Sequence, residues 1–554
     1  MIGRVPSPRN PNGAVNPEPE PPPSSPPRAE PAAPPGFHLG LAGAVAPILV
    51  FAAGAAWLGF SGAPDERGLW PVLLAALGVG LLLARSASAY SAAALRGMSR
   101  PIVMLMVAAW LLAGVFSVVL RESGLVHALV WTGSELGVSG GGFVLMSFLI
   151  AVLFSTATGT SLGTILICAP LLYPAAGVLE ASPVALIGAI LAGATFGDNV
   201  SPVSDTTIAS ASSQRAPMGG VVRSRLRYAL PAALGAALIL TLLGGAEATV
   251  TQAPSQGAML EGNPAALPML LAPLAAFFML WRGRGLVESL FAGVAAALVL
   301  ALALGLVAPA DLVYIDREAF QARGLILDGM EGSVGIVIFT ILLMGIVGAA
   351  QEAGILDRLA RDPRRAAESA RAAELRIFGV TSVAVLLTTH SVMAILAVGD
   401  LVRDAGRRSG VGRLRRANLL DMTVCTYPFL LPFFIPTILA ASATASGEPF
   451  GIPRVSALEA GLANAYSWAL LAAILLAIGT GFGRSEAGGG SAEAPRQGAV
   501  SRGDVSTENV SRLRGRAEMM RIAVGGGDGQ PGRGLRAPGD APVAFDLSAG
   551  MAEW

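Results

Sequence analysis

Eight long apolar segments, separated by short polar loops, constrain this chain more than any other feature. They cover residues 38–60, 70–84, 101–120, 229–245, 266–281, 286–307, 333–350 and 458–483. A helix needs about 20 mostly apolar residues to cross the hydrocarbon core of a bilayer. Charged residues make up only 14% of the 554 residues, whereas soluble globular proteins contain about 25%. We therefore expect an all-α polytopic membrane protein, and the composition excludes a soluble multidomain enzyme.

The basic residues exclude two further classes of protein. The 38 basic residues balance 37 acidic ones, so no excess positive charge is available for nucleic acid. All the basic residues are arginine, and a Walker A phosphate loop requires a lysine, so the chain by itself is not an ATP-driven pump. We also expect neither a cofactor nor an enzymatic activity, because no His, Asp and Glu cluster has metal-site spacing and no nucleophile–base pair is visible.

The two ends differ from the membrane part. Thirteen of the 38 prolines lie in residues 1–35, and the last 71 residues are rich in Gly, Arg, Ser and Glu. Neither end can bury enough apolar surface to offset the entropy lost on ordering, so both are predicted to be disordered arms. The predicted division is an arm (1–36), N-terminal membrane helices (37–100), transport repeat 1 (101–245), connecting membrane helices (246–332), transport repeat 2 (333–440), a last membrane helix (441–483) and a tail (484–554).

Loop charges predict the orientation of the chain. Arginine-rich loops, including the stretch from Arg215 to Arg227, are expected on the cytoplasmic side, which places both termini there in the inner membrane of a bacterium. This scheme requires segment 377–402 to enter and leave from the cytoplasm, and segment 142–178 to enter and leave from outside. Each is interrupted by hydroxyl-rich residues. Because non-helical backbone at membrane depth is tolerated where it lines a cavity, we predict two re-entrant hairpins of half-helices.

A sequence repeat pairs these two hairpins. Thr158-Gly-Thr-Ser161 is followed 230 positions later by Thr388-Thr-His-Ser391, and Leu120–Val126 resembles Ala350–Leu356 at the same offset. The loop charges give the two halves opposite directions across the membrane. An inverted repeat with broken helices is the architecture of secondary transporters, whose sites lie near the bilayer midplane.

A polar stretch at 197–207 carries the most informative chemistry. Its polar side chains are Asp198, Asn199, Ser201, Ser204, Asp205, Thr206 and Thr207. Carboxylate and hydroxyl oxygens are the ligands of hard cations such as Na⁺, and Pro202 frees backbone carbonyls by interrupting a helix. Burial favours the protonated carboxyl group and a bound cation favours the ionised one, so one aspartate can hold either H⁺ or Na⁺. The alternative is that 203–228 is a solvated loop in which Asp205 caps a helix.

Two motifs resemble those of a known family. The stretch Phe196-Gly-Asp-Asn-Val-Ser-Pro-Val-Ser-Asp-Thr-Thr207 resembles the GD-x-x-SP-x-SDTT signature of NhaC-type Na⁺/H⁺ antiporters. Ala157-Thr-Gly-Thr-Ser-Leu-Gly-Thr164 is similar to the ATGTSWGT stretch of that family, with Leu162 in place of the usual Trp. A looser likeness extends over about 100–440, and neither arm is covered.

The resemblance implies a transporter of two inverted repeats with re-entrant hairpins. It implies Na⁺ extrusion against proton entry or, as in relatives, Na⁺/H⁺-linked exchange of small organic anions such as malate and lactate, and it suggests a homodimer. Two departures leave the transported solute open. Ile208 follows SDTT where family members often carry Asn, and the family's LEDAGTVTSPLIPW stretch is matched only at Asp421, Thr426 and Pro428.

The sequence therefore predicts a site with two walls. The Na⁺/H⁺ site consists of Asp198, Ser201, Asp205, Thr206 and Thr207. The substrate or second wall consists of Thr158, Thr160, Ser161, Asn199, Thr389, His390, Ser391 and Asp421. His390 has two interpretations, a proton relay that titrates near neutral pH or a hydrogen-bonded structural histidine. For Asp421 the choice is between an ion ligand and a helix cap.

Three functions remain open on the sequence alone. The first is a monovalent-cation/proton antiporter that uses Asp198 and Asp205. The second is a Na⁺-coupled carrier of organic anions, in which half-helix N-termini hold the substrate carboxylate. The third is a non-transporting membrane protein such as a receptor or scaffold. Membrane lipids are expected partners in every case.

Overall fold

The computed structural model describes residues 35–61, 66–245, 264–317, 320–355 and 369–484. Nearly all of the two predicted arms lies outside these residues. Eight helices in the described part are long and apolar enough to cross a membrane. The chain is therefore a multi-pass, almost entirely helical membrane protein, as predicted.

The first half of the helical core is built from broken and continuous helices. They are α4 (Pro101–Glu122), α5 (Leu125–Glu135), α6 (Gly140–Thr158), α7 (Ser161–Leu172), α8 (Pro183–Val200), α9 (Asp205–Ser213) and α10 (Met218–Gly244). The second half consists of α14 (Leu325–Glu352), α16 (Ala370–Thr388), α17 (Ser391–Arg408), α18 (Arg413–Val424), α19 (Ile435–Ala443), α20 (Ala457–Leu462) and α21 (Ala465–Thr480). The offset of 230 residues seen in the sequence relates α6 to α16 and α9 to α19 at both ends of each helix, so the predicted repeat is confirmed in the fold.

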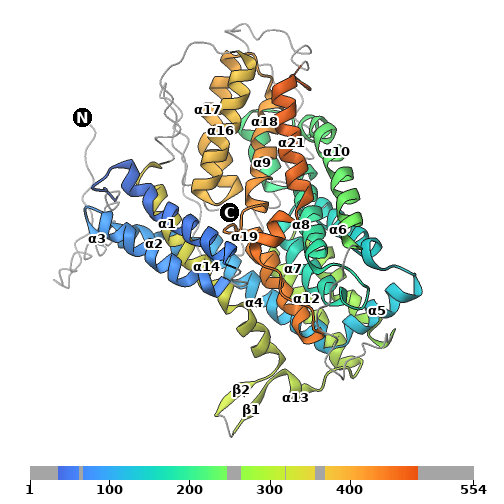
Figure 1. Ribbon diagram of the computed structural model, residues 1–554. Coiled ribbons are helices and arrows are strands. Elements are labelled where there is room, and N and C mark those ends of the chain that lie inside the picture. The colour runs from blue at the N-terminus through green and yellow to red at the C-terminus, as the bar shows by residue number, and fades with distance from the viewer. Residues whose placement is uncertain (1–34, 62–65, 246–263, 318–319, 356–368, 485–554) are drawn as a thin grey trace, which may run out of the picture.

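The remaining elements flank this core. At the N-terminus they are α1 (Leu41–Phe60), α2 (Leu69–Leu83) and α3 (Ala87–Met98); between the halves they are α11 (Leu271–Trp281), α12 (Leu286–Ala303), α13 (Pro309–Leu312) and a small antiparallel pair, β1 (Tyr314–Asp316) and β2 (Gln321–Arg323). Helices α1 to α3 lie beside α14 on one side of the molecule, and the β pair projects at one end (Figure 1).

Both predicted hairpins are present, and each breaks at a left-handed residue. Gly159 separates α6 from α7 with a φ of 72°, and Thr389 separates α16 from α17 with a φ of 52°. A Cβ atom at Gly159 would lie 2.8 Å from the backbone nitrogen of Ser204. Only glycine combines the left-handed conformation with this close approach. The tip of the first hairpin therefore rests directly on the break between α8 and α9.

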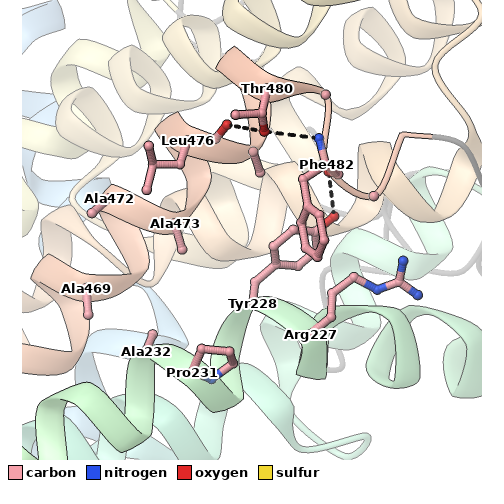
Figure 2. Close-up of a pocket in the computed structure, with 13 residues that line it drawn as sticks. Arg227, Tyr228, Pro231, Ala232, Ala469, Ala472, Ala473, Leu476, Thr480 and Phe482 are labelled. Carbon is pink, nitrogen blue, oxygen red and sulfur yellow. Dashed lines mark hydrogen bonds between the residues drawn. The ribbon is translucent and has the colours of Figure 1, made fainter.

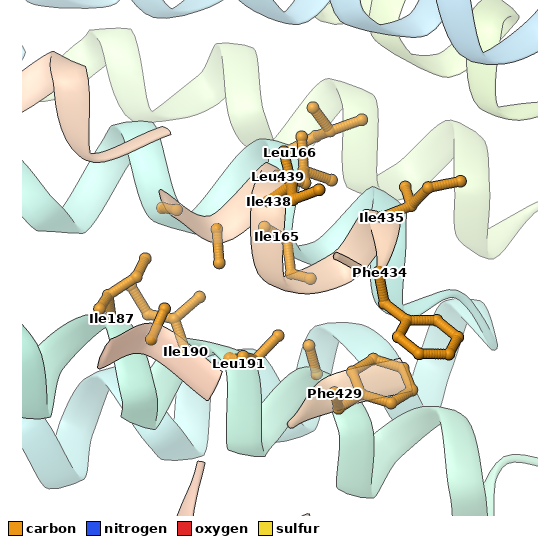
Figure 3. Close-up of a cluster of buried hydrophobic side chains, with 14 of the residues drawn as sticks. Ile165, Leu166, Ile187, Ile190, Leu191, Phe429, Phe434, Ile435, Ile438 and Leu439 are labelled. Carbon is orange, nitrogen blue, oxygen red and sulfur yellow. The ribbon is translucent and has the colours of Figure 1, made fainter. Parts of the chain in front are cut away.

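Helix α8 occupies the centre of the bundle. Of the most apolar 18-residue stretch between Pro183 and Ser213, 94% is buried, against 33% for the corresponding stretch of α6. Side chains from α7, α8, α19 and the segment just before α19 meet in an apolar cluster (Figure 3). The cluster includes Ile165, Leu166, Ile187, Ile190, Leu191, Phe429, Phe434, Ile435, Ile438 and Leu439. This packing holds elements of the two halves against each other around α8.

One expectation from the loop charges is wrong, and one alternative interpretation is excluded. Helix α10 begins at Met218 rather than at residue 229, so the stretch up to Arg227 is largely helical and not a loop. Arginine is a good helix former, and Arg225 is fully buried on this helix. The segment 203–228 is also not a solvated loop, because α9 and the first turns of α10 pack into the core.

Candidate functional site

The break between α8 and α9 places a carboxylate inside the protein. Asp198 lies on the last turns of α8 and is only 6% exposed. Its Oδ2 atom accepts a hydrogen bond from Ser161 Oγ at 2.7 Å, and its Oδ1 atom accepts one from Ser204 Oγ at 2.6 Å. Ser161 is the first residue of α7, so the hairpin tip and the helix break are joined through this carboxylate. The arrangement surrounds one buried acid with hydroxyl oxygens.

Asp205 is the first residue of α9, and Ser204 occupies the N-cap position, with its hydroxyl directed to Asp198 instead of to the helix backbone. The Ser204 hydroxyl also lies 3.0 Å from the hydroxyl of Thr206. Asp205 is therefore not the cap that the alternative interpretation assumed. A carboxylate in the first turn is nevertheless favoured by the partial positive charge of the helix N-terminus.

A cavity of about 100 Å³ connects these groups with both hairpin tips. It is lined by Met106, Thr160, Ser161, Leu162, Asp198, Asp205, Thr206, Thr389, His390, Ser391, Val392, Pro428, Phe429, Ile435 and Pro436. Two carboxylates face it, whereas no arginine is found among these described lining residues. A space of this size holds an ion with a few water molecules, since one water occupies about 30 Å³ in the liquid.

The structure brings together eight of the predicted site residues and leaves five outside. The five that do not line the cavity are Thr158, Asn199, Ser201, Thr207 and Asp421. The hydroxyl of Thr158 donates to the carbonyl of Phe154 in its own helix at 2.8 Å. The Ser201 hydroxyl accepts from the backbone N–H of Val203 at 3.3 Å. The remaining three belong to a second polar cluster behind the cavity.

This second cluster is centred on a buried ion pair that sequence reasoning missed. Arg225 Nη1 lies 2.6 Å from Asp421 Oδ2, and both side chains are fully buried. The same guanidinium donates to Thr207 Oγ1 at 2.8 Å and to the carbonyl of Asn199. Asp421 does not line the cavity and lies within α18, where its side chain pairs with an arginine on α10.

A signal for this pair was present in the sequence. Asp421 stands within an apolar stretch, and a carboxylate at that depth needs a partner. Asn199 connects the pair to the last helix, because its amide donates to Asp421 Oδ1 at 3.4 Å and its Oδ1 accepts from Tyr466 OH at 3.0 Å. Nothing in the sequence indicated Tyr466 as a member of the network.

The two repeats differ at their second breaks. The break between α8 and α9 corresponds, at the offset of 230 residues, to the segment between α18 and α19. There, Pro428 occupies the position equivalent to Asp198, Phe434 that of Ser204 and Ile435 that of Asp205. The break of the first repeat is therefore polar, and the equivalent break of the second is apolar. The acidic side of the cavity comes from one repeat, while the second contributes an apolar wall together with His390.

Removing one hydroxyl tests the role of the hairpin tip. Ser161→Ala leaves Asp198 with one hydroxyl donor instead of two, and a hydrogen bond to a charged group contributes about 1.5–3 kcal/mol. The sequence predicts a Na⁺ site here, and on that prediction the half-saturating Na⁺ concentration in membrane vesicles should rise by roughly tenfold or more. Thr158→Val is the matched control, because its hydroxyl faces its own helix, and it should leave that value unchanged. An unchanged value in Ser161→Ala would remove Ser161 from the site.

Comparison with known proteins identifies the family of the chain. A family model described as the Na⁺/H⁺ antiporter family matches residues 42–245 and 256–449. The chain belongs to the Na⁺/H⁺ antiporter family. This membership confirms the resemblance carried by the 196–207 and 157–164 motifs, and antiporter families are transporters rather than enzymes.

Three antiporters are similar in sequence to this chain. The Na⁺/H⁺ antiporter NhaC of Alkalihalophilus pseudofirmus is 24% identical over 348 residues, which cover 60% of this chain and 74% of the relative. The malate-2H⁺/Na⁺-lactate antiporter of Bacillus subtilis is 36% identical over 122 residues, which cover 22% of this chain and 26% of the relative. The arginine/ornithine antiporter ArcD of Halobacterium salinarum is 24% identical, with 65% of this chain and 77% of the relative covered. The match to the malate/lactate antiporter thus spans about a quarter of its length.

Proposed function

We propose that this antiporter-family member exchanges Na⁺ or Li⁺ for H⁺ across the cytoplasmic membrane of a bacterium. The observation that carries the proposal is the pair Asp198 and Asp205, which face one small cavity between the two hairpin tips. Carboxylate and hydroxyl oxygens of this kind are suitable ligands for a hard monovalent cation. The ions are transported solutes in this proposal, and no resident cofactor takes part.

The exchange follows from competition for the same oxygen atoms. Protonated Asp198 offers a neutral carboxyl group, whereas ionised Asp198 offers a negative charge that a cation can neutralise. The hydroxyls of Ser161, Ser204 and Thr206 supply further ligands, with Asp205 beside them. A bound Na⁺ displaces the proton, and a proton arriving from the other side displaces Na⁺. Access alternates when one half rocks against the other around the site.

Charge favours a cation over an organic anion as the transported solute. Among the described residues no arginine lines the cavity, and the buried Arg225 behind it is paired with Asp421. An organic anion would have to bind close to two carboxylates. The second candidate is a carrier of small organic anions such as the malate and lactate named for one relative. It is supported by the N-terminus of α17, because Thr389, His390 and Ser391 face the cavity there and a helix N-terminus can bind a carboxylate.

The proposed orientation has both termini in the cytoplasm. It rests on the positive-inside rule, applied to the arginine clusters at the N-terminal ends of α10 and α18 and at the C-terminal end of α17. Under this orientation the first hairpin enters from outside and the second from the cytoplasm.

Everted membrane vesicles containing the protein test the proposed function. A proton gradient is formed first and reported by a pH-sensitive dye, and NaCl, LiCl, KCl or choline chloride is then added. We expect NaCl or LiCl to dissipate the gradient, and choline chloride to have no effect. A response that requires malate or lactate together with Na⁺ would favour the second candidate. No response to any of these additions would contradict both.

A further inference from the structure

The buried arginine behind the cavity is held by oxygen atoms that converge on one of its nitrogens. Arg225 Nη1 carries two N–H groups, and these donate to Thr207 Oγ1 at 2.8 Å and to the carbonyl of Asn199. A third oxygen, Asp421 Oδ2, lies 2.6 Å from the same nitrogen. The other terminal nitrogen, Nη2, is buried and has no hydrogen-bond partner among the described residues. One nitrogen is therefore surrounded by more oxygen atoms than it has protons, and the other donates to none of them.

Arg415 shows the arrangement in which a guanidinium and a carboxylate match each other. Its Nε and Nη2 donate to the two carboxylate oxygens of Glu374 at 3.0 and 3.2 Å, and its Nη1 donates to Tyr228 OH at 2.8 Å. The Tyr228 hydroxyl in turn donates to the carbonyl of Phe482 at 3.2 Å, beside a groove between α10 and α21 (Figure 2). Each nitrogen of Arg415 thus has one acceptor, as expected for two paired planar groups. The oxygen atoms around Arg225 lack this match.

The oxygen atoms around Arg225 are of the kinds that bind a compact cation. They are a carboxylate oxygen, a hydroxyl, a backbone carbonyl and, at 3.2 Å from Nε, the side-chain oxygen of Asn418. Carboxylate, hydroxyl and carbonyl oxygens are the ligands of hard cations. The carbonyl belongs to Asn199 in the last turn of α8, where backbone carbonyls lose their intrahelical partners and carry partial negative charge. The location therefore favours a positive charge of any shape.

These oxygen atoms come from both halves of the protein. Asn199 and Thr207 flank the break between α8 and α9, whereas Asp421 lies on α18 in the second half. None of the three lines the cavity that contains Asp198. The oxygen set is therefore a site of its own between the two halves, and Arg225 reaches it from α10.

We propose that these oxygen atoms form a second site for an alkali cation, which the side chain of Arg225 fills as a tethered cation. The guanidinium supplies the positive charge that the buried carboxylate of Asp421 requires, and it excludes a free ion from the same oxygen atoms. Arg225 thereby keeps the second site from taking part in the exchange at Asp198. This last consequence rests on the proposed function, whereas the site itself does not.

Removing the tethered cation should open the site. Arg225→Ala is made in the Asp198→Asn background, so that the cavity lacks its exchanging carboxylate. The purified full chain is heated in detergent with Na⁺, K⁺, guanidinium or choline chloride at the same low concentration. We expect Na⁺ or K⁺ to raise the apparent unfolding temperature by a few degrees relative to choline, because a ligand that binds the folded state stabilises it. A shift of the same size in Asp198→Asn alone would overturn the proposal.

Two further variants make the result specific to this site. Adding Asp421→Asn to the double variant should remove the shift, because no carboxylate is then left among the oxygen atoms. Arg415→Ala in the same Asp198→Asn background is the matched control. It also removes a buried arginine from a carboxylate, but Glu374 keeps its ion pair with Arg484 at 2.7 Å, so no shift is expected. A shift that persists without Asp421, that Arg415→Ala shows equally, or that only guanidinium produces would overturn the proposal.

Arg225→Lys gives a test that does not require Arg225→Ala to fold. A lysine ammonium is a compact cation with three N–H donors, as many as the oxygen atoms that surround Arg225 Nη1. Arg225→Gln places a neutral side chain at the same position. In the otherwise wild-type protein, we expect Arg225→Lys to unfold at a higher temperature than Arg225→Gln. An equal or lower unfolding temperature would overturn the proposal, because it would show that the site requires the shape of the guanidinium and not a cation.

Discussion

Replacing Asp198 with asparagine is expected to abolish Na⁺-dependent proton movement while leaving the protein folded. Asparagine has nearly the same shape: its carbonyl oxygen can accept from one of Ser161 and Ser204, and its amide N–H can donate to the hydroxyl of the other. It cannot carry the charge that binds a cation or the proton that is exchanged. At an effective dielectric constant of about 20, losing one unit charge about 4 Å from the ion corresponds to about 4 kcal/mol. We therefore expect exchange in everted vesicles to fall at least about a hundredfold.

Two further variants locate the effect. Asp205→Asn should also weaken exchange, since Asp205 faces the same cavity. Asp328→Asn is the matched control, because this exposed carboxylate lies in the first turn of α14 and does not line the cavity. It should leave exchange unchanged. If Asp198→Asn retained normal exchange in vesicles with equal amounts of protein, Asp198 would not be the exchanging group.

Breaking the Arg225–Asp421 pair is expected to cause the largest loss of stability. Asp421→Asn leaves a buried guanidinium without its counter-ion, and removing one partner of a buried pair costs about 3–5 kcal/mol. The variant should unfold at a clearly lower temperature in detergent than the wild type. The double variant Arg225→Gln/Asp421→Asn removes both charges of this pair, and we expect it to recover part of the loss.

An exposed ion pair provides the control for this experiment. Glu448 and Arg454 are joined at 2.7 Å, with side chains 51% and 32% exposed. Surface pairs contribute about 0–1 kcal/mol, so Glu448→Gln should shift the unfolding temperature little. A double variant less stable than Asp421→Asn alone would show that Arg225 stabilises the protein mainly through Thr207 and Asn199, and not through the ion pair.

The helix breaks could be predicted from the sequence because each has a local cause. Gly159 and Pro202 disfavour a continuous helix within apolar segments that otherwise predict one. The offset of 230 residues then identified the partner break at Thr389. Asp198 and Asp205 could be selected because so few other charges occur in the apolar part of the chain, where an ionisable side chain is costly.

The second polar cluster could not be predicted in the same way. Arg225 lies in a run of arginines that has the composition of a cytoplasmic loop, and its burial depends on Asp421 approaching from a distant part of the chain. The direction in which a side chain at a helix end points also depends on tertiary packing, which the local sequence does not show. Thr158 and Ser161 are close in the sequence and of similar chemistry, but only Ser161 faces Asp198.

Proton release on Na⁺ binding tests the central claim most directly, because it requires no membrane and no gradient. Purified protein in weakly buffered solution is mixed with NaCl or with choline chloride, and a pH-sensitive dye records the change. If Na⁺ and H⁺ compete for Asp198, NaCl will release protons from the wild type and from Asp328→Asn, but not from Asp198→Asn. Saturable Na⁺ binding without proton release from the wild type would contradict the shared site.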